Sequence, residues 1–552
     1  MKRLVAIIMT IAMAASAFSG CNSGSGNSSA AGSSSGADSS TAADSSAAVD
    51  SEADTSDADD AASGEVEELT VMVWDRGNAA PGTTNEDNAL TDYIKDRVLK
   101  EANVEVSYMA VPRSGSDDKL NVMMAGGSAP GIVFSYGQDM FTNYASNGGL
   151  TDLTEPLATY GDQIMEFTGD VQPMGLYEGQ QFAIMKKRSD SASRHVQYIR
   201  KDWLDKLGMD MPKTKDEFFE ALYAFKEKNP GEVDNVIPWM MSGVTDTEKN
   251  YLNFIGSYTG PFDETTKRDE YVYSEAYLIF RDGAVEGIKK MNQLYNDGLI
   301  YNDFVSDTNE DIWRQEISSG NAGFVLSDRT QPWELFEAAK ADDPTVDFQA
   351  VSTFELSDGS YRNPAEPYYG MFIMVPQNRS EMANAAVKYL NWMADPAVAE
   401  DILYSPDHSN TENGVPIPLT EEEAYEHGYP GTMADLNILN DKLAYSETKE
   451  GVVESYMQWN SWEEKPWFEN SYDIIFKDGY FVYDTYPAVI QAEAEYGNNI
   501  KTLSVEYVYK LICCDPAEFD ALQEAEYAKL VSAGLEDVLN ERGEWYDANV
   551  GK

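Results

Sequence analysis

Apolar and amphipathic segments alternate in the first part of the chain in an order that restricts the fold strongly. Residues 69–74 are short, apolar and β-rich, residues 88–102 have helical spacing, and residues 104–108 alternate between apolar and polar. A second helical segment at residues 117–125 leads into the short apolar run 132–134. Strand, helix, strand, helix, strand is the order found in parallel sheets that carry helices on both faces. The sequence therefore predicts an α/β fold.

The same rhythm continues along the chain, with a larger share of helix. Residues 214–228 and 488–545 have helical character. Residues 322–326 and 371–375 are compact apolar runs of the kind that form buried strands. A chain of 552 residues is also long enough for more than one domain. We therefore expect more than one α/β domain, with helix dominating the second half.

The N-terminus has the pattern of an export signal. Two basic residues precede an apolar run at residues 4–17, which suits a signal-peptide core and is short for a bilayer span. The run ends in small residues before Cys21, similar to a bacterial lipobox, with Phe18 where an aliphatic residue is usual. We expect residues 1–21 to be a lipoprotein signal peptide with its lipidated cysteine, which tethers without spanning. A signal peptide cleaved elsewhere, releasing a secreted protein, is the alternative.

Residues 22–66 differ in composition from the rest of the chain. They are nearly all Ser, Ala, Gly, Asp and Glu, without Lys, Arg or an aromatic side chain. Such a segment cannot bury enough apolar surface to offset its chain entropy, and its like charges repel one another. We expect a disordered acidic linker that holds a folded body away from the membrane.

The formal net charge of −55 excludes some partners. Nucleic-acid binding requires the opposite sign, and adhesion to anionic lipid by electrostatics is disfavoured for the same reason. An anionic ligand is also disfavoured, although a local basic cleft can override the mean field.

Cysteine and histidine give no pattern of a metal or cofactor site. Cys513 and Cys514 are adjacent, so they can join only in a strained ring, and we expect them to pack as small side chains on a C-terminal helix. His195, His408 and His427 lack the spacing of zinc ligands. We therefore expect neither a metal nor a cofactor.

Several segments, in a consistent order, resemble the large solute-binding lipoproteins of carbohydrate ABC importers. The most specific of them is YIRKDWLDKLG at residues 198–208. Gly131 stands where that family usually has Asp, and residues 404–416 lack the Gly-rich, Glu-containing turn of many relatives. The resemblance covers almost all of the chain after residue 67. Its other segments are residues 117–132, 144–154, 212–218, 295–300 and 320–333.

The resemblance implies a two-lobed fold, like that of periplasmic binding proteins of type II, with a hinge between discontinuous lobes. We expect the first lobe at residues 67–185 plus 350–405, and the second at residues 186–349 plus 406–552. The family captures its ligand between the lobes. This agrees with the general rules that ligands bind beyond the carboxyl ends of sheet strands and that such clefts close by hinge motion.

The resemblance also implies a carbohydrate ligand. A sugar offers hydroxyl groups and flat C–H faces, so it suits aromatic platforms with polar side chains that make paired hydrogen bonds. Aromatic and polar residues near strand ends are the candidates, whereas we expect Trp203 to pack within its lobe. The predicted ligand contacts are Trp74, Asp75, Arg76, Arg113, Tyr136, Gln138, Trp239, Trp333, Tyr368, Tyr369, Trp459 and Trp462.

Together these features predict a receptor rather than an enzyme. We expect a monomer, lipid-anchored at the outer face of the cytoplasmic membrane, that binds an oligosaccharide and delivers it to ABC permease subunits. One alternative is a binding lipoprotein for another solute, such as a peptide, which would use main-chain pairing more than aromatic platforms. The other is a cell-surface glycoside hydrolase, which needs two carboxylates a few ångströms apart. The chain lacks the eightfold strand–helix rhythm of a barrel enzyme.

Overall fold

All residues described by the computed structural model lie in one compact unit, Asp60–Lys552. The expected signal peptide, Cys21 and nearly all of the expected linker therefore lie outside the described residues. The described residues are 66–188, 195–245, 247–261, 263, 265–329, 332–361, 363–365, 367–408, 411–412, 415–416, 418–440, 449–450, 453, 457, 464–475, 480–482, 486 and 488–550.

The buried hydrophobic side chains of this unit gather around two separate sheets. One cluster draws on residues 69–185 and 371–439. Two further clusters draw on residues between 196 and 538 and surround the other sheet. We call the part around the first sheet the first lobe (residues 66–188 and 367–440) and the part around the second sheet the second lobe (residues 195–361 and 449–550).

The sheet of the first lobe begins with the strands that the sequence pattern predicts. β1 (Glu67–Asp75) pairs in parallel with β2 (Val104–Pro112), and a parallel bridge joins Val71 to Ile132. β12 (Tyr369–Met374) returns from later in the chain to pair antiparallel with β3 (Val133–Ser135) and β6 (Ala183–Lys187). The predicted strand at residues 371–375 is thus the one that brings the chain back to the first lobe.

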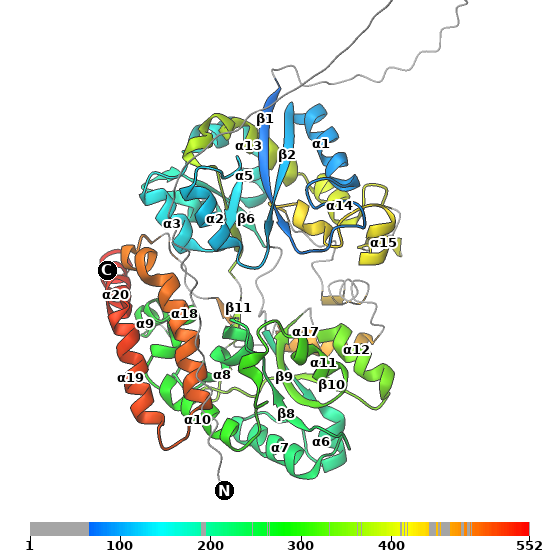
Figure 1. Ribbon diagram of the computed structural model, residues 1–552, viewed down its shortest axis with the longest axis vertical. Coiled ribbons are helices and arrows are strands. Elements are labelled where there is room, and N and C mark those ends of the chain that lie inside the picture. The colour runs from blue at the N-terminus through cyan, green and yellow to red at the C-terminus, as the bar shows by residue number, and fades with distance from the viewer. Residues whose placement is uncertain are drawn as a thin grey trace, which may run out of the picture. The chain divides into compact units, whose positions relative to one another are not determined.

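Helices cover this sheet, as the strand–helix order requires. Helix α1 begins after Asn88, whose side chain accepts the N–H groups of Leu90 and Thr91 in a capping box. Figure 1 shows α1 beside β2, while α13 packs against β1. The helices of this lobe are α1 (Ala89–Ala102), α2 (Ser116–Ala125), α3 (Gln138–Ser146), α4 (Thr154–Tyr160), α5 (Asp162–Thr168), α13 (Ala383–Ala394), α14 (Pro396–Tyr404) and α15 (Glu421–Glu426).

The second lobe has a four-stranded mixed sheet in the order β10–β7–β9–β8. β8 (Ile237–Met240) runs parallel to β9 (Ala322–Asp328), and β7 (His195–Arg200) lies antiparallel between β9 and β10 (Phe348–Val351). Every residue of β7 and β8 is buried, since helices cover both faces of the sheet. The α/β class predicted from the sequence is confirmed.

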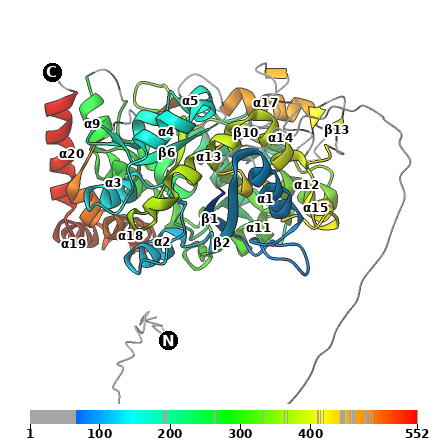
Figure 2. The same ribbon diagram turned by 90° about the horizontal axis from the view of Figure 1, so that it is seen from above.

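Helix dominates the second lobe, as its sequence predicts. Helix α7 begins after Thr214, whose hydroxyl accepts the N–H of Glu217. Three helices close the described chain, and Figure 2 shows α18, α19 and α20 together at one side. The longer helices are α6 (Lys201–Leu207), α7 (Lys215–Lys228), α9 (Lys267–Val272), α10 (Ala284–Asn296), α11 (Asp311–Ser318), α12 (Pro332–Asp342), α17 (Lys465–Ile475), α18 (Gln491–Cys513), α19 (Phe519–Ser532) and α20 (Leu535–Asn549).

The packing places the crossings between lobes at different residues from those expected. β10 pairs with β7 and Phe354 joins the second core, so the crossing follows residue 354 rather than 350. Ala424 and Leu439 pack in the first core, so the first lobe extends well beyond residue 405. Apolar spacing marks a face as buried without saying against which core it packs, and this explains the difference. Between the lobes, β11 (Asn363–Ala365) pairs in parallel with β15 (Tyr480–Val482).

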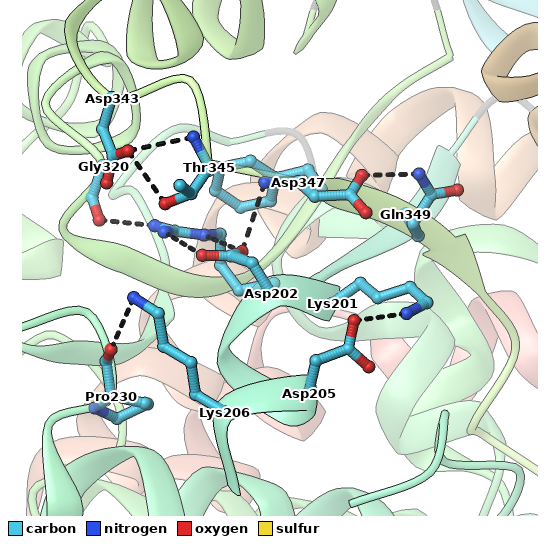
Figure 3. A network of polar contacts seen from close by, with 12 residues as sticks. Lys201, Asp202, Asp205, Lys206, Pro230, Gly320, Asp343, Thr345, Asp347 and Gln349 are labelled. Carbon is cyan, nitrogen blue, oxygen red and sulfur yellow. Dashed lines mark hydrogen bonds and ion pairs between the residues drawn. The ribbon is translucent and has the colours of Figure 1, made fainter. Parts of the chain in front are cut away.

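A buried ion pair holds the corner between β7 and α6. Arg200 Nε lies 2.7 Å from Asp202 Oδ1, and its terminal nitrogens donate to Asp202 Oδ2 and to the Gly320 carbonyl. Figure 3 shows the network around Asp202, including the Asp347 N–H that also donates to this carboxylate. Trp203 is fully buried, which confirms its expected packing role. The motif at residues 198–208 is therefore structural.

Candidate ligand-binding site

Three predicted ligand residues meet at one edge of the first-lobe sheet. Trp74 lies near the end of β1, Arg113 directly follows β2, and Tyr136 directly follows β3. The Trp74 and Tyr136 rings are stacked, with centroids 5.8 Å apart and planes inclined by 23°. The Arg113 guanidinium carbon lies 4.3 Å from the Trp74 ring centroid and 5.8 Å from that of Tyr136. We call Trp74, Arg113 and Tyr136 the aromatic corner.

The two rings of the aromatic corner differ in accessibility. Trp74 is 7% exposed and also packs edge-on against Phe134, at a centroid distance of 5.1 Å. Tyr136 is 42% exposed. Tyr136 can therefore contact a ligand, while the buried Trp74 ring stacks against it.

Asp75 and Arg76 lie beside this corner, but their side chains are already engaged. The Asp75 carboxylate accepts the Gly77 N–H and the Asn85 side-chain amide, each at 2.8 Å. Arg76 makes a two-pronged ion pair with Asp435, at 2.5 and 3.0 Å, and this hydrogen bonding raises the pKa of the arginine. Both residues mainly fix the loops around the corner.

A cavity of about 300 Å³ continues from Tyr136 between the two lobes, a size at the lower end for small-molecule sites. The predicted residues Gln138 and Tyr369 line it as well. Gln138 also bridges the lobes, because its amide donates to the Tyr486 carbonyl at 2.8 Å. The lining residues from the first lobe are Tyr136, Gly137, Gln138, Asp139, Thr142 and Tyr369; those from the second are Tyr271, Ser274, Glu275, Tyr486, Ala488, Ile490, Glu493, Lys501 and Arg542.

Two ion pairs give this cavity its polar character. Lys501 lies 3.1 Å from Asp139 across the lobes, and Arg542 lies 2.8 Å from Glu493. Burial alone would lower the pKa of both cations, but the neighbouring carboxylates raise it, so both stay charged. Paired charges of this kind offer donors and acceptors side by side, as sugar hydroxyls require.

No strand-end signal in the sequence points to these charged residues, because the helices α3, α18 and α20 carry them. Arg542 lies one turn from both Val538 and Tyr546, and all three are buried. In the sequence, one signal points to Arg542: it is a charged side chain on the apolar face of a helix. Figures 1 and 2 both show α18 beside α3, and the Asn143 amide donates to the Ala494 carbonyl at 3.3 Å.

Tyr368 and a further arginine complete the surroundings of Tyr136. Tyr368 is 56% exposed, and its carbonyl accepts the Arg188 N–H at 2.7 Å. The Arg188 guanidinium carbon lies 5.6 Å from the Tyr136 ring centroid, and its Nε donates to the Tyr369 carbonyl at 3.2 Å. Arg188 was not among the residues predicted from the sequence.

Two other predicted platforms lie in the core of the second lobe. Trp239 is fully buried within β8, with the rings of Phe254 and Phe324 each 5.4 Å away. Trp333 is 1% exposed on the first turn of α12, and the Phe468 ring lies 4.5 Å from it. Neither indole has a free face for a ligand in this arrangement, so neither belongs to the site proposed below. Trp459 and Trp462 lie outside the described residues.

Other chemistry is sparse in the part of the chain that the structure describes. No group of three or more His, Cys, Asp or Glu residues there is arranged to hold a metal ion. Nor does any helix within the described ranges have the length and apolarity needed to cross a membrane. Cys513 and Cys514 are free thiols, and burial raises the pKa of Cys513 to about 11, which keeps it protonated and unreactive at neutral pH.

Comparison with known proteins identifies the family. Residues 94–405, more than half of the chain, match the family of bacterial extracellular solute-binding proteins, and the chain belongs to that family. It is therefore an extracellular solute-binding protein and not an enzyme.

Individual relatives agree with this assignment. The chain is 28% identical over 342 residues to lipoprotein LipO of Bacillus subtilis (strain 168), covering 58% of this chain and 62% of LipO, less than two thirds of that relative's length. It is 23% identical to the polygalacturonan/rhamnogalacturonan-binding protein YtcQ of the same strain, over 81% of this chain and 87% of YtcQ. Among solved structures, the alginate-binding protein AlgQ2 without calcium ion aligns with a TM-score of 0.63 at 16% identity, over 88% of this chain and 98% of AlgQ2. The two-lobed solute-binding fold is thus confirmed.

Proposed function

We propose that this protein is the substrate-binding component of an ABC importer and that it captures an oligosaccharide between its lobes. The observation that carries the proposal is the exposed Tyr136 ring, backed by Trp74, at the mouth of a cavity lined by paired charged side chains. The similarity to YtcQ, a polygalacturonan/rhamnogalacturonan-binding protein, supports a carbohydrate ligand.

In the proposed complex each part of the site has a separate task. A sugar ring stacks on Tyr136, where its C–H face meets the aromatic face. Gln138 and Tyr369 contact hydroxyl groups at the entrance of the cavity. The pairs Lys501–Asp139 and Arg542–Glu493 donate to and accept from other hydroxyl groups of the ligand in the cavity. Tyr368, Asp75 and Arg76 flank the ligand, whereas Trp459 and Trp462 stay predictions from the sequence.

The proposed delivery mechanism rests on the discontinuous lobes. The chain passes between them after β6, before β12 and again after residue 440, so several crossings form the proposed hinge. Ligand binding closes the lobes, and the permease subunits recognise the closed form. The protein acts as a monomer, and acylated Cys21 with the linker at residues 22–66 tethers it to the outer face of the cytoplasmic membrane.

Loss of the Tyr136 ring should weaken binding without unfolding the protein. For Tyr136→Ala we expect a loss of about 1–3 kcal/mol in binding free energy, which is typical of a ring that carries a stacking contact. Calorimetry measures it with the oligosaccharide that raises the melting temperature most in a thermal-shift screen. Tyr136→Phe is the matched control, because it keeps the ring and should keep most of the affinity. Equal affinity of wild type and Tyr136→Ala would remove Tyr136 from the site.

Closure of the lobes should be visible in solution. We expect the radius of gyration from small-angle X-ray scattering to fall when the same oligosaccharide saturates the protein, because hinge closure brings the lobes together. A non-binding sugar of equal size is the control and should leave the curve unchanged. A saturating ligand that causes no compaction would contradict the hinge mechanism.

A further inference from the structure

Three arginines, one of them part of the aromatic corner, lie close to its two rings in a chain whose formal net charge is −55. The guanidinium carbons of Arg113 and Arg76 lie 4.3 and 5.7 Å from the Trp74 ring centroid. Those of Arg188 and Arg113 lie 5.6 and 5.8 Å from the Tyr136 ring centroid. In a protein with so few basic residues, this gathering of positive charge at the proposed site calls for an explanation.

The arginines differ in how their charge is compensated. Arg76 has a two-pronged ion pair with Asp435. The half-buried Arg113 side chain, in contrast, makes no ion pair or hydrogen bond to any residue that the structure describes, and its Nε is fully shielded from solvent. Its guanidinium instead lies over the rings of Trp74 and Tyr136. Arg113 is therefore a cation stacked on aromatic rings that makes no hydrogen bond or ion pair with a described carboxylate, although Asp117 lies close enough to interact with it electrostatically.

This arrangement is unfavourable until an anion arrives. A stacked cation gains only a modest stabilisation from an aromatic ring, whereas a shielded donor without an acceptor pays a desolvation cost that nothing offsets. The charges of Arg113 and Arg188, next to the same ring, also repel each other. A carboxylate matches the planar guanidinium in a paired hydrogen bond and would satisfy both demands.

The other two cations that line the cavity make no such demand. Lys501 already faces Asp139, and Arg542 already faces Glu493. An anionic group is therefore favoured at the aromatic corner and not in the interior of the cavity. The overall negative charge disfavours an anion at long range, but a local basic site can override this mean field at contact distance.

We propose that the ligand is an acidic oligosaccharide, with the carboxylate of a uronate unit bound by Arg113 and Arg188 while its ring lies on Tyr136. This inference rests on the proposed function and narrows it to a substrate class. The neutral hydroxyl groups of the neighbouring units extend into the cavity between the lobes.

The test compares ligands that differ only in charge. Calorimetry on the purified wild-type protein uses tetragalacturonate, tetramannuronate and tetraguluronate, each beside its fully methyl-esterified form, together with neutral and sulfated tetrasaccharides. We expect at least one uronate to bind about tenfold to a hundredfold more tightly than its ester, as one charged, paired hydrogen bond allows. The preference should shrink as the salt concentration rises, because exposed charges are screened.

Variants then show which residue causes the preference for the uronate over its ester. Arg113→Gln should remove most of the difference between acid and ester, and Arg113→Lys, which keeps the charge but not the planar fork, should remove part of it. Lys289→Gln is the control, since it removes one positive charge from an exposed pair with Asp520. It should leave both affinities unchanged. Melting temperatures identify any variant that fails to fold. The comparison of each uronate with its ester on the wild-type protein tests the inference even if a variant fails to fold.

Three outcomes would overturn the inference. If neutral tetrasaccharides bind and no uronate is preferred over its ester, the acidic substrate class is wrong while the proposed function stands. If a sulfated tetrasaccharide binds more tightly than every uronate, the carboxylate assignment is wrong. If no oligosaccharide binds at all, the proposed function fails together with the inference.

Discussion

The variant Asp202→Asn should lose about 3–5 kcal/mol of the free energy of unfolding, the usual result of breaking a buried ion pair from one side. The Arg200 side chain is 2% exposed and Asp202 is 9% exposed. Without the carboxylate, the guanidinium would keep its charge among Trp203 and Phe348, 4.5 and 5.4 Å away. Urea unfolding followed by tryptophan fluorescence measures the change.

Asp205, three residues further on, provides the matched control. It pairs with Lys201 at 2.5 Å, but both side chains are substantially exposed, 60% and 39%. Exposed pairs contribute about 0–1 kcal/mol, so Asp205→Asn should change stability little. If the two variants were equally mild, the buried network in Figure 3 would not hold the corner between β7 and α6.

Trp333→Ala should destabilise the second lobe by about 3–5 kcal/mol, the range for removing a large aromatic side chain from a core. The indole is 1% exposed and packs edge-on against Trp467 and Phe468. From the sequence alone, Trp333 was expected to stack on a sugar. Because the indole is buried, we expect the substitution to lower stability and not ligand affinity. Affinity measured well below the melting temperature should stay within about twofold of wild type, which is about 0.4 kcal/mol.

Denaturation and calorimetry on the same Trp333→Ala sample separate the two roles. Trp333→Phe refills part of the cavity and should recover part of the lost stability, since the cost scales with the residual cavity. A variant that keeps its stability and loses ligand affinity would return Trp333 to the binding site.

The sequence predicts the first-lobe site better than the second because of the way parallel sheets are built. Trp74, Arg113 and Tyr136 all stand near strand ends, and parallel strands bring those ends to one edge. The same reasoning fails for Trp239, which lies inside β8 where both faces of the strand are covered. It fails for Trp333 because a helix that follows a strand can turn its first-turn aromatic inward.

The second-lobe part of the site depends on contacts that sequence spacing does not encode. Arg542 reaches the cavity because α20 packs against α18 and α9, and Lys501 reaches Asp139 because α18 lies against α3. These are tertiary pairings between segments far apart in the chain. The same limitation affects the lobe boundaries, since the apolar residues of 424–439 could have packed against either core.

An equilibrium binding screen shows most directly whether an oligosaccharide binds at the aromatic corner between the lobes. Purified protein is titrated calorimetrically with acidic and neutral oligosaccharides and with peptide pools of similar mass. We predict saturable binding of at least one oligosaccharide at one site per molecule, with a raised melting temperature and no binding of peptides. Saturable binding of peptides with no response to any oligosaccharide would show that the protein is not an oligosaccharide receptor.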